Sequence, residues 1–170
     1  MKNLWAPWRM EYILGNEKKY DGCIFEAAEA KTCDRDMLVL YRDALAVVLL
    51  NRFPYANGHL LLAPTRHVAD LEDLDRHESS GLMGMLKTCT TILKKNLQPE
   101  GFNIGLNLGK TAGAGLDEHL HFHIVPRWDG DHNFMATICA IRTIPEHITR
   151  TFDQLLDDFQ EKIQTNAADK

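Results

Sequence analysis

The sequence is short of the features that define several classes of protein. Its four cysteines are scattered and do not form the framework of a small disulfide-rich domain. Its longest apolar run is well below the roughly 20 residues of a membrane span, and the N-terminus MKNLWAPWRMEYILG has no apolar signal-peptide core. The 19 Lys and Arg residues are outnumbered by 24 Asp and Glu residues, which argues against a basic patch for nucleic acid. We therefore expect a reduced, cytoplasmic protein that binds neither a membrane nor a nucleic acid polymer.

The remaining composition is that of an ordinary folded domain, with 45% hydrophobic and 25% charged residues. Short β-rich apolar segments separated by turn residues predict strands, and apolar residues recurring every three or four positions predict helices. We expect strands at 37–42, 45–50, 59–64, 102–109 and 119–127, an extended piece at 134–142, and helices at 76–96 and 145–164.

The short connections favour an α+β fold, an antiparallel five-stranded sheet with helices packed on it. We divide the chain into an N-terminal arm (1–36), a central domain (37–144) and a C-terminal helix and tail (145–170). Pro145 is expected at or near the first turn of the last helix, where its missing N–H costs nothing.

The segment HLHFHIV (119–125) carries three of the chain's eight histidines at alternate positions. Side chains alternate along a strand, so His119, His121 and His123 share one face, and the apolar residues between them face the core. Crowding three imidazoles together costs free energy and adds no packing, which indicates a function. Metal binding and a nucleophile flanked by hydrogen-bonding partners are both compatible with this pattern.

The glycine-rich segment NLGKTAGAGLDE (107–118) directly precedes the three histidines. Glycines let backbone N–H groups approach a ligand and form an anion-binding concavity. The segment lacks the Lys-Ser/Thr ending of a P-loop. A phosphate held by backbone beside a histidine strand indicates phosphoryl or nucleotidyl transfer to an imidazole.

These motifs together resemble the histidine triad (HIT) family. HLHFHIV matches the family pattern at every position, and LLNRFPYANGHLLLAPTRHVADL (49–71) resembles its earlier segment, with an Asn, a Gly-His before a strand and a Pro-x-x-His after it. LWAPWRMEYI and VPRWDGDHNFM are similar to the bacterial branch that resembles diadenosine tetraphosphate phosphorylases and hydrolases. The resemblance implies the HIT-like fold and a homodimer that joins two sheets into a continuous ten-stranded one.

The resemblance also implies the roles of individual residues. His121 would attack the α-phosphate of a nucleotide, and a carbonyl near His119 would hold the proton of its other nitrogen. His123 would stabilise charge on the phosphate, His59 matches a further histidine near the site, and Asn51 matches a position that bonds the ribose hydroxyls. Water or phosphate would then resolve the nucleotidyl-histidine.

Nucleotide binding is further expected from the loop before the triad. Asn107 resembles the Asn at the start of the family's loop, although its spacing to His119 is one residue longer than in some members. Some relatives carry Gln or Ser shortly before the triad, where this chain has Gly115, Leu116 and Asp117. Backbone amides from Gly113 to Asp117 would hold the phosphate instead, which leaves the preferred leaving group open.

A structural zinc is implied in some family members by Cys-x-x-Cys together with two histidines. The corresponding residues here are Cys23, Glu26, His67 and His119, with Glu26 in place of the second cysteine. A carboxylate can bind zinc, so either the site is occupied or it has decayed and Cys23 is a small buried residue. The chemistry at His121 requires no cofactor.

The leading interpretation is an enzyme that acts on dinucleoside polyphosphates, such as diadenosine tetraphosphate, or on adenylated small molecules. Hydrolysis and phosphorolysis both remain open. The alternative is a nucleotide-binding sensor or interaction module with weak catalysis, although such a module has no need of a nucleophile. A zinc-dependent hydrolase with the triad as metal ligands leaves the glycine loop unexplained.

Overall fold

The computed structural model describes residues 22–26, 34–131 and 144–168. The histidine at position 132, the extended piece expected at 134–142 and much of the N-terminal arm lie outside these residues. The described elements are β1 (Val39–Arg42), β2 (Ala46–Leu50), β3 (Leu60–Pro64), a 3-10 turn (Leu71–Asp73), α2 (Arg76–Leu97), β4 (Gly101–Leu106), a second 3-10 turn (Lys110–Ala112), β5 (Phe122–Arg127) and α4 (Ile148–Ala168).

The strands form one five-stranded sheet in the order β1-β2-β3-β5-β4, and every neighbouring pair is antiparallel. This confirms the expected α+β fold with an antiparallel five-stranded sheet. The order places β5, which carries the last residue of the triad, between β3 and β4 in the sheet.

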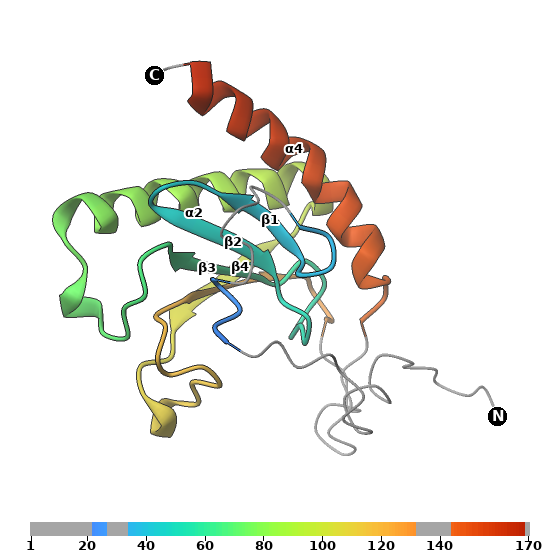
Figure 1. Cartoon of the computed structure of the whole chain (residues 1–170). Coiled ribbons are helices and arrows are strands. Elements are labelled where there is room, and N and C mark those ends of the chain that lie inside the picture. Colours follow the sequence, from blue (N-terminus) through green and yellow to red (C-terminus); the bar gives the residue numbers. More distant parts are fainter. Residues whose placement is uncertain (1–21, 27–33, 132–143, 169–170) are drawn as a thin grey trace.

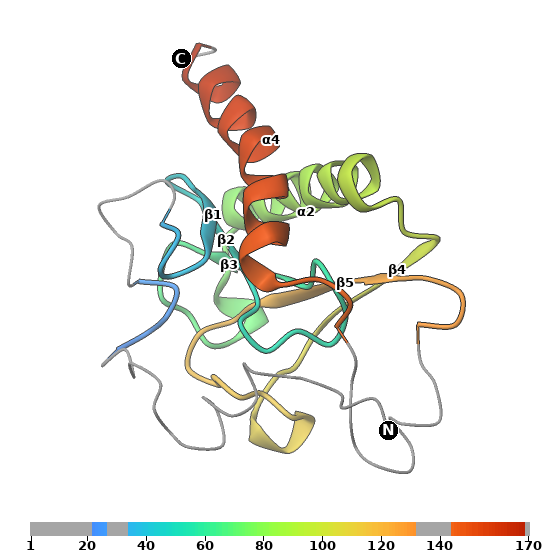
Figure 2. The same cartoon turned by 90° about the vertical axis from the view of Figure 1, so that its right-hand side faces the viewer.

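The two faces of the sheet are covered differently. Leu60 and Leu62 of β3 belong to a buried cluster with apolar residues of α2 and α4, whereas Leu61 and Ala63 belong to a second cluster on the opposite face. Both helices lie on one side of the sheet, and the loop that follows β4, drawn in yellow, lies on the other (Figures 1 and 2). In the described part of the chain, neither helix is long and apolar enough to cross a membrane.

Strand β5 starts at Phe122, so the prediction of a strand from residue 119 was wrong for its first three residues. The reason lies in the partner strand, because β3 ends at Pro64, which has no N–H to offer a ladder. The Pro64 carbonyl is within 2.9 Å of His119 Nε2, and the Leu120 N–H donates to the Val68 carbonyl at 2.7 Å. His119 and Leu120 are therefore held by contacts outside the ladder.

Other element boundaries also differ from the prediction, most of them by one residue, and three show larger or structural differences. β1 begins at Val39 because Leu38 adopts a left-handed conformation with φ of 58°. β4 ends at Leu106, before the glycine loop. α4 begins at Ile148 instead of residue 145, so Pro145 lies just before its first turn.

A tight turn at Gly58 leads the chain from the 51–59 loop into β3. Gly58 has φ of +71°, and a Cβ at this position would collide with the Leu97 side chain. Only glycine satisfies both conditions, since it has no Cβ and tolerates positive φ. The turn thereby fixes where the next residue, His59, enters the sheet.

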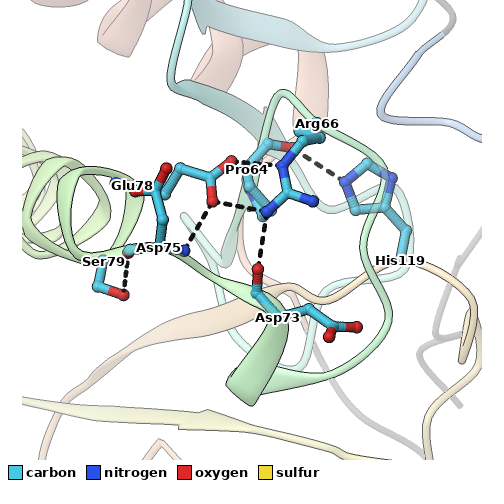
Figure 3. A network of polar contacts seen from close by, with 7 residues as sticks. All are labelled: Pro64, Arg66, Asp73, Asp75, Glu78, Ser79 and His119. Carbon is cyan, nitrogen blue, oxygen red and sulfur yellow. Dashed lines mark hydrogen bonds and ion pairs between the residues drawn. The ribbon is translucent and has the colours of Figure 1, made fainter.

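The start of α2 is tied to the loop between β3 and α2 (Figure 3). Asp75 caps the helix by accepting the Glu78 N–H at 2.8 Å, and the Glu78 carboxylate accepts the Asp75 N–H at 2.9 Å. The Arg66 guanidinium donates two hydrogen bonds of 2.7 Å to the same carboxylate and a third to the Asp73 carbonyl. The network fixes the segment that carries Pro64 and His67.

Replacement of Glu78 by Gln should lower stability in a pH-dependent manner. The Arg66 hydrogen bonds lower the pKa of Glu78 from 4.5 to about 2. A depressed pKa stabilises the fold above the unfolded value, and this contribution is lost as the pH falls through about 5 toward 2. We expect Glu78→Gln to cost roughly 1 kcal/mol at pH 7, since Arg66 is half exposed.

The measurement is urea unfolding of both proteins between pH 7 and pH 3, with Glu72→Gln as the control in the adjacent exposed turn. The stability difference between wild type and Glu78→Gln should narrow as the pH falls. A difference that stays constant with pH would contradict the assignment to the ionised Glu78.

Candidate active site and metal-ligand cluster

The His121 ring is held in one orientation by the backbone of the triad itself. Its Nδ1–H donates to the carbonyl of His119 at 2.8 Å, and the residue is 8% exposed. In a neutral ring that donates through Nδ1, the lone pair is on Nε2. The Nε2 of a neutral His121 ring therefore carries the lone pair, and the proton on Nδ1 is held by the His119 carbonyl.

His119 is a buried link rather than a surface residue of the triad, with an exposed fraction of 1%. Its Nε2–H donates to the Pro64 carbonyl at 2.9 Å, which leaves Nδ1 as an acceptor 3.1 Å from the Cys23 Sγ. Burial lowers the pKa of His119. A neutral imidazole with a free Nδ1 lone pair is the form that binds a metal.

The structure brings three of the four predicted metal ligands together. The ligand atoms of Cys23, His67 and His119 all lie within 4.8 Å of one another. The fourth, Glu26, contacts the His67 Nδ1 at 3.0 Å and is not part of this cluster. A cysteine sulfur and two imidazoles form a donor set that suits zinc. Burial raises the pKa of the Cys23 thiol, so Cys23 is protonated at neutral pH without a metal.

His59 and His123 form a second pair of imidazoles at the other end of the triad. The His59 Nε2 lies 3.0 Å from the His123 Nδ1, and His59 has no exposed surface. Burial, followed by repulsion from His121, lowers the pKa of His123. The ring centroids of His121 and His123 are 5.0 Å apart, so the pair lies directly beside His121.

Asn51 makes contacts that the sequence did not predict. Its Oδ1 accepts the Phe53 N–H at 2.9 Å, and its Nδ2 lies 3.2 Å from the His59 Nδ1. The amide is half-buried between the loop backbone and His59. Asn51 therefore has a role inside the protein, in addition to any contact with a ribose.

Two aromatic side chains frame the imidazoles, and sequence reasoning assigned neither to the site. The ring of Phe25, fully buried, lies 5.0 Å from His119 and 5.2 Å from His121. The Tyr55 ring stacks on His123 at 5.9 Å with an interplanar angle of 17°. Each residue reaches the site from a loop, so neither belongs to a periodic sequence pattern. The one sequence feature that pointed to them is their position between predicted site residues, Phe25 between Cys23 and Glu26 and Tyr55 between Asn51 and His59.

The loop between β4 and β5 lies next to the triad. Leu106 pairs with Phe122 and Gly105 with His123, and the half-buried Asn107 directly follows the end of β4. A Cβ at Gly105 would have no neighbour within 4 Å. The space beside His123 is therefore open.

The remaining predicted loop residues have different surroundings. Gly113 adopts φ of +91° and Gly115 is exposed. The Leu116 side chain packs against the second core cluster, so only its backbone can face a ligand. Asp117 forms an ion pair of 3.6 Å with Lys110 across the loop.

These features define an α+β protein with a buried cluster of histidines beside a glycine loop, and comparison with known proteins identifies the family. Residues 34–130 match the HIT domain. The chain is 40% identical over 157 residues to the AP-4-A phosphorylase of Mycobacterium tuberculosis, which covers 89% of this chain and 80% of that protein. The chain belongs to the HIT domain family.

Two further relatives show the breadth of the likeness. The asymmetrical bis(5'-nucleosyl)-tetraphosphatase of Schizosaccharomyces pombe is 33% identical over 93 residues, 55% of this chain and 50% of that protein. A zinc-bound histidine triad family protein from Mycobacterium smegmatis superposes with a TM-score of 0.59 at 25% identity, over 75% of this chain and 87% of that one.

Proposed function

We propose that this protein is a nucleotidyl transferase that cleaves dinucleoside polyphosphates, with diadenosine tetraphosphate as the representative substrate. The observation that carries the proposal is the His121 ring, whose Nδ1–H is held by the His119 carbonyl so that Nε2 is free to attack. The 40% identity to an AP-4-A phosphorylase supports this substrate class and favours phosphate over water as the second acceptor.

The proposed reaction has two displacement steps at the α-phosphorus. In the first, the His121 Nε2 forms a P–N bond while the P–O bond to the leaving nucleotide breaks, and ATP leaves from diadenosine tetraphosphate. In the second, an oxygen of inorganic phosphate attacks the same phosphorus, the P–N bond breaks, and ADP is released. Water in the second step would release AMP instead.

The other predicted residues have binding roles in this scheme. Asn51 would form hydrogen bonds to the ribose hydroxyls with the hydrogen-bonding capacity of its amide that its contacts to Phe53 and His59 do not use. Asn107 and the backbone N–H groups from Gly113 to Asp117 would hold the phosphates, because a glycine-rich loop lets amides approach an anion closely. The His123 ring, beside the open space at Gly105, would donate a hydrogen bond to the transferred phosphate.

Replacement of His121 by Ala should reduce the turnover rate by at least about a thousandfold, because the covalent route loses its nucleophile. Nucleotide affinity should stay within about tenfold, since the binding groups remain. Product chromatography after incubation with diadenosine tetraphosphate, with and without phosphate, measures the change. ADP plus ATP indicates phosphorolysis, and AMP plus ATP indicates hydrolysis.

His77→Ala is the matched control, an exposed histidine on the first turn of α2. Near-normal turnover by His121→Ala would exclude the mechanism. If the wild-type protein binds nucleotide tightly but does not turn over diadenosine tetraphosphate, with or without phosphate, the result would favour the sensor alternative.

A structural zinc is proposed at the cluster of Cys23, His67 and His119. The Cys23 Sγ and the His119 Nδ1 would be ligands, and His67 would bind through Nε2 because Glu26 holds its Nδ1. A carboxylate that orients a metal-bound histidine is a common partner in such sites. Glu26 either keeps this contact or turns to fill the fourth position. The zinc would fix the ligands in place and take no part in the transfer.

Replacement of Cys23 by Ser should remove about one zinc per chain and lower the melting temperature, with some turnover retained. Replacement of Glu26 by Gln separates its two possible roles: an orienting carboxylate costs about 10–100-fold in zinc affinity, and a true ligand costs more. Elemental analysis and thermal unfolding with and without a chelator measure both. Cys89→Ala, in the helix core, should keep the metal. Zinc-free wild type with unchanged stability would show that the site has decayed.

A homodimer is proposed through β4, which lies at the edge of the sheet. Ile104 on this strand is 42% exposed and Leu108 just after it is 45% exposed. An exposed apolar edge strand is a ready template for pairing with a second copy, which would extend the sheet to ten strands.

Sedimentation velocity should give twice the chain mass of 19.4 kDa. Ile104→Asp should weaken association by at least about tenfold, because a charge would be buried at the edge. Leu71→Asp, at an exposed site in the 3-10 turn before α2, should leave it unchanged. A wild type that sediments as a monomer at all concentrations would contradict the dimer.

A further inference from the structure

The loop from Asn51 to His59 directs two backbone N–H groups at side chains of the site. The Phe53 N–H donates to the Asn51 Oδ1 at 2.9 Å, and the Tyr55 N–H donates to the His59 Nδ1 at 3.1 Å. The loop is closed by a 2.8 Å bond from the Asn51 N–H to the His59 carbonyl. A backbone N–H can only donate, so each of these contacts fixes the identity of the atom that it meets.

The first contact fixes the side-chain amide of Asn51. Because the oxygen of this amide faces the Phe53 N–H, its nitrogen faces the His59 Nδ1 at 3.2 Å. The His59 Nδ1 is thus met by two donors, the Asn51 amide and the Tyr55 N–H. It must be an unprotonated acceptor, and in a neutral imidazole the proton is then on Nε2.

The proton of His59 determines that of His123. The His59 Nε2–H points at the His123 Nδ1 over 3.0 Å, so that nitrogen accepts. The proton of neutral His123 is consequently on its Nε2, the nitrogen that does not face His59. The loop thus fixes the proton position of His59, and His59 fixes that of His123.

We propose that His59 is a positioning residue. The Tyr55 N–H and the Asn51 amide fix the proton of His59 on Nε2, and this proton keeps His123 as a neutral Nε2–H donor to the transferred phosphate. The inference rests on the proposed function for its phosphate, but the proton positions themselves do not. It assigns Asn51 a second role, the orientation of His59, besides the expected contact with the ribose.

The surroundings disfavour a cationic His123. A second proton would have to sit on Nδ1, directly opposite the N–H of His59, and His59 cannot turn its proton away because its Nδ1 faces the Tyr55 N–H. The described titratable groups in contact with the His123 ring are His59, His121 and Tyr55. None of them supplies a negative charge at neutral pH, and burial of His123 acts in the same direction.

The direct test is long-range proton–nitrogen NMR on the full chain labelled at histidine, without nucleotide. Such spectra distinguish protonated from unprotonated ring nitrogens. At pH 7, His59 and His123 should each show an unprotonated Nδ1 and a protonated Nε2. A proton on the Nδ1 of either ring, or a cationic His123, would overturn the proposal whatever the protein's activity.

Variants test whether the proton position of His123, as set by His59, affects turnover. His59→Leu should lower kcat by about 10–100-fold with KM within about threefold, because the donor to the phosphate is no longer held. His59→Gln should recover most of this loss, since its amide can place an N–H near the position of the His59 Nε2. In His59→Leu the proton of His123 should distribute over both nitrogens in the NMR spectrum.

A double mutant decides whether His59 acts through His123. If it does, His59→Leu combined with His123→Ala is no slower than His123→Ala alone. A further loss equal to that of His59→Leu would show independent action and overturn the proposal. If the wild type turns over no dinucleoside polyphosphate, the proposed function fails, while the NMR result still decides the proton positions.

Discussion

Three hydrogen-bonding groups of His119 connect the end of β3, Cys23 and His121. Its Nε2–H binds the carbonyl at the end of β3, its Nδ1 faces the Cys23 sulfur, and its carbonyl holds the proton of His121. Because the ring is buried and held at both nitrogens, the carbonyl of the same residue has a fixed direction. The orientation of the His121 ring therefore depends on how firmly His119 is held, and the proposed metal on Nδ1 would hold it more firmly.

The two faces of the sheet have different roles in holding the triad histidines in fixed orientations. On one face α2 and α4 bury the larger apolar cluster, which supplies rigidity without carrying chemistry. On the other face a short segment around Phe25 covers β1–β3, and the Arg42 guanidinium donates to the Phe25 carbonyl. The Phe25 ring then packs against His119 and His121. The histidines of the triad thus rest on a rigid scaffold, and an aromatic residue packs against two of them.

Much of the fold could be predicted from the sequence because the signals are local. Alternation and turn residues predicted five strands, and the three-and-four spacing predicted α2 to within one residue of its end. The start of β5 could not be predicted, because it depends on Pro64 ending the partner strand. The same holds for the contacts of Asn51, which follow from the path of the loop between β2 and β3 rather than from any pattern.

By itself, the sequence predicted the kind of chemistry: three imidazoles at alternate positions beside a glycine loop indicate phosphoryl or nucleotidyl transfer, and the resemblance to the HIT family implies a metal site that includes Cys23. Only the tertiary structure decided which nitrogen of each ring carries a proton. His119 meets a carbonyl 55 positions away, and His123 meets a histidine 64 positions away. An imidazole takes its proton position from its partners, and these partners come together only when β3, β5 and the 51–59 loop are assembled.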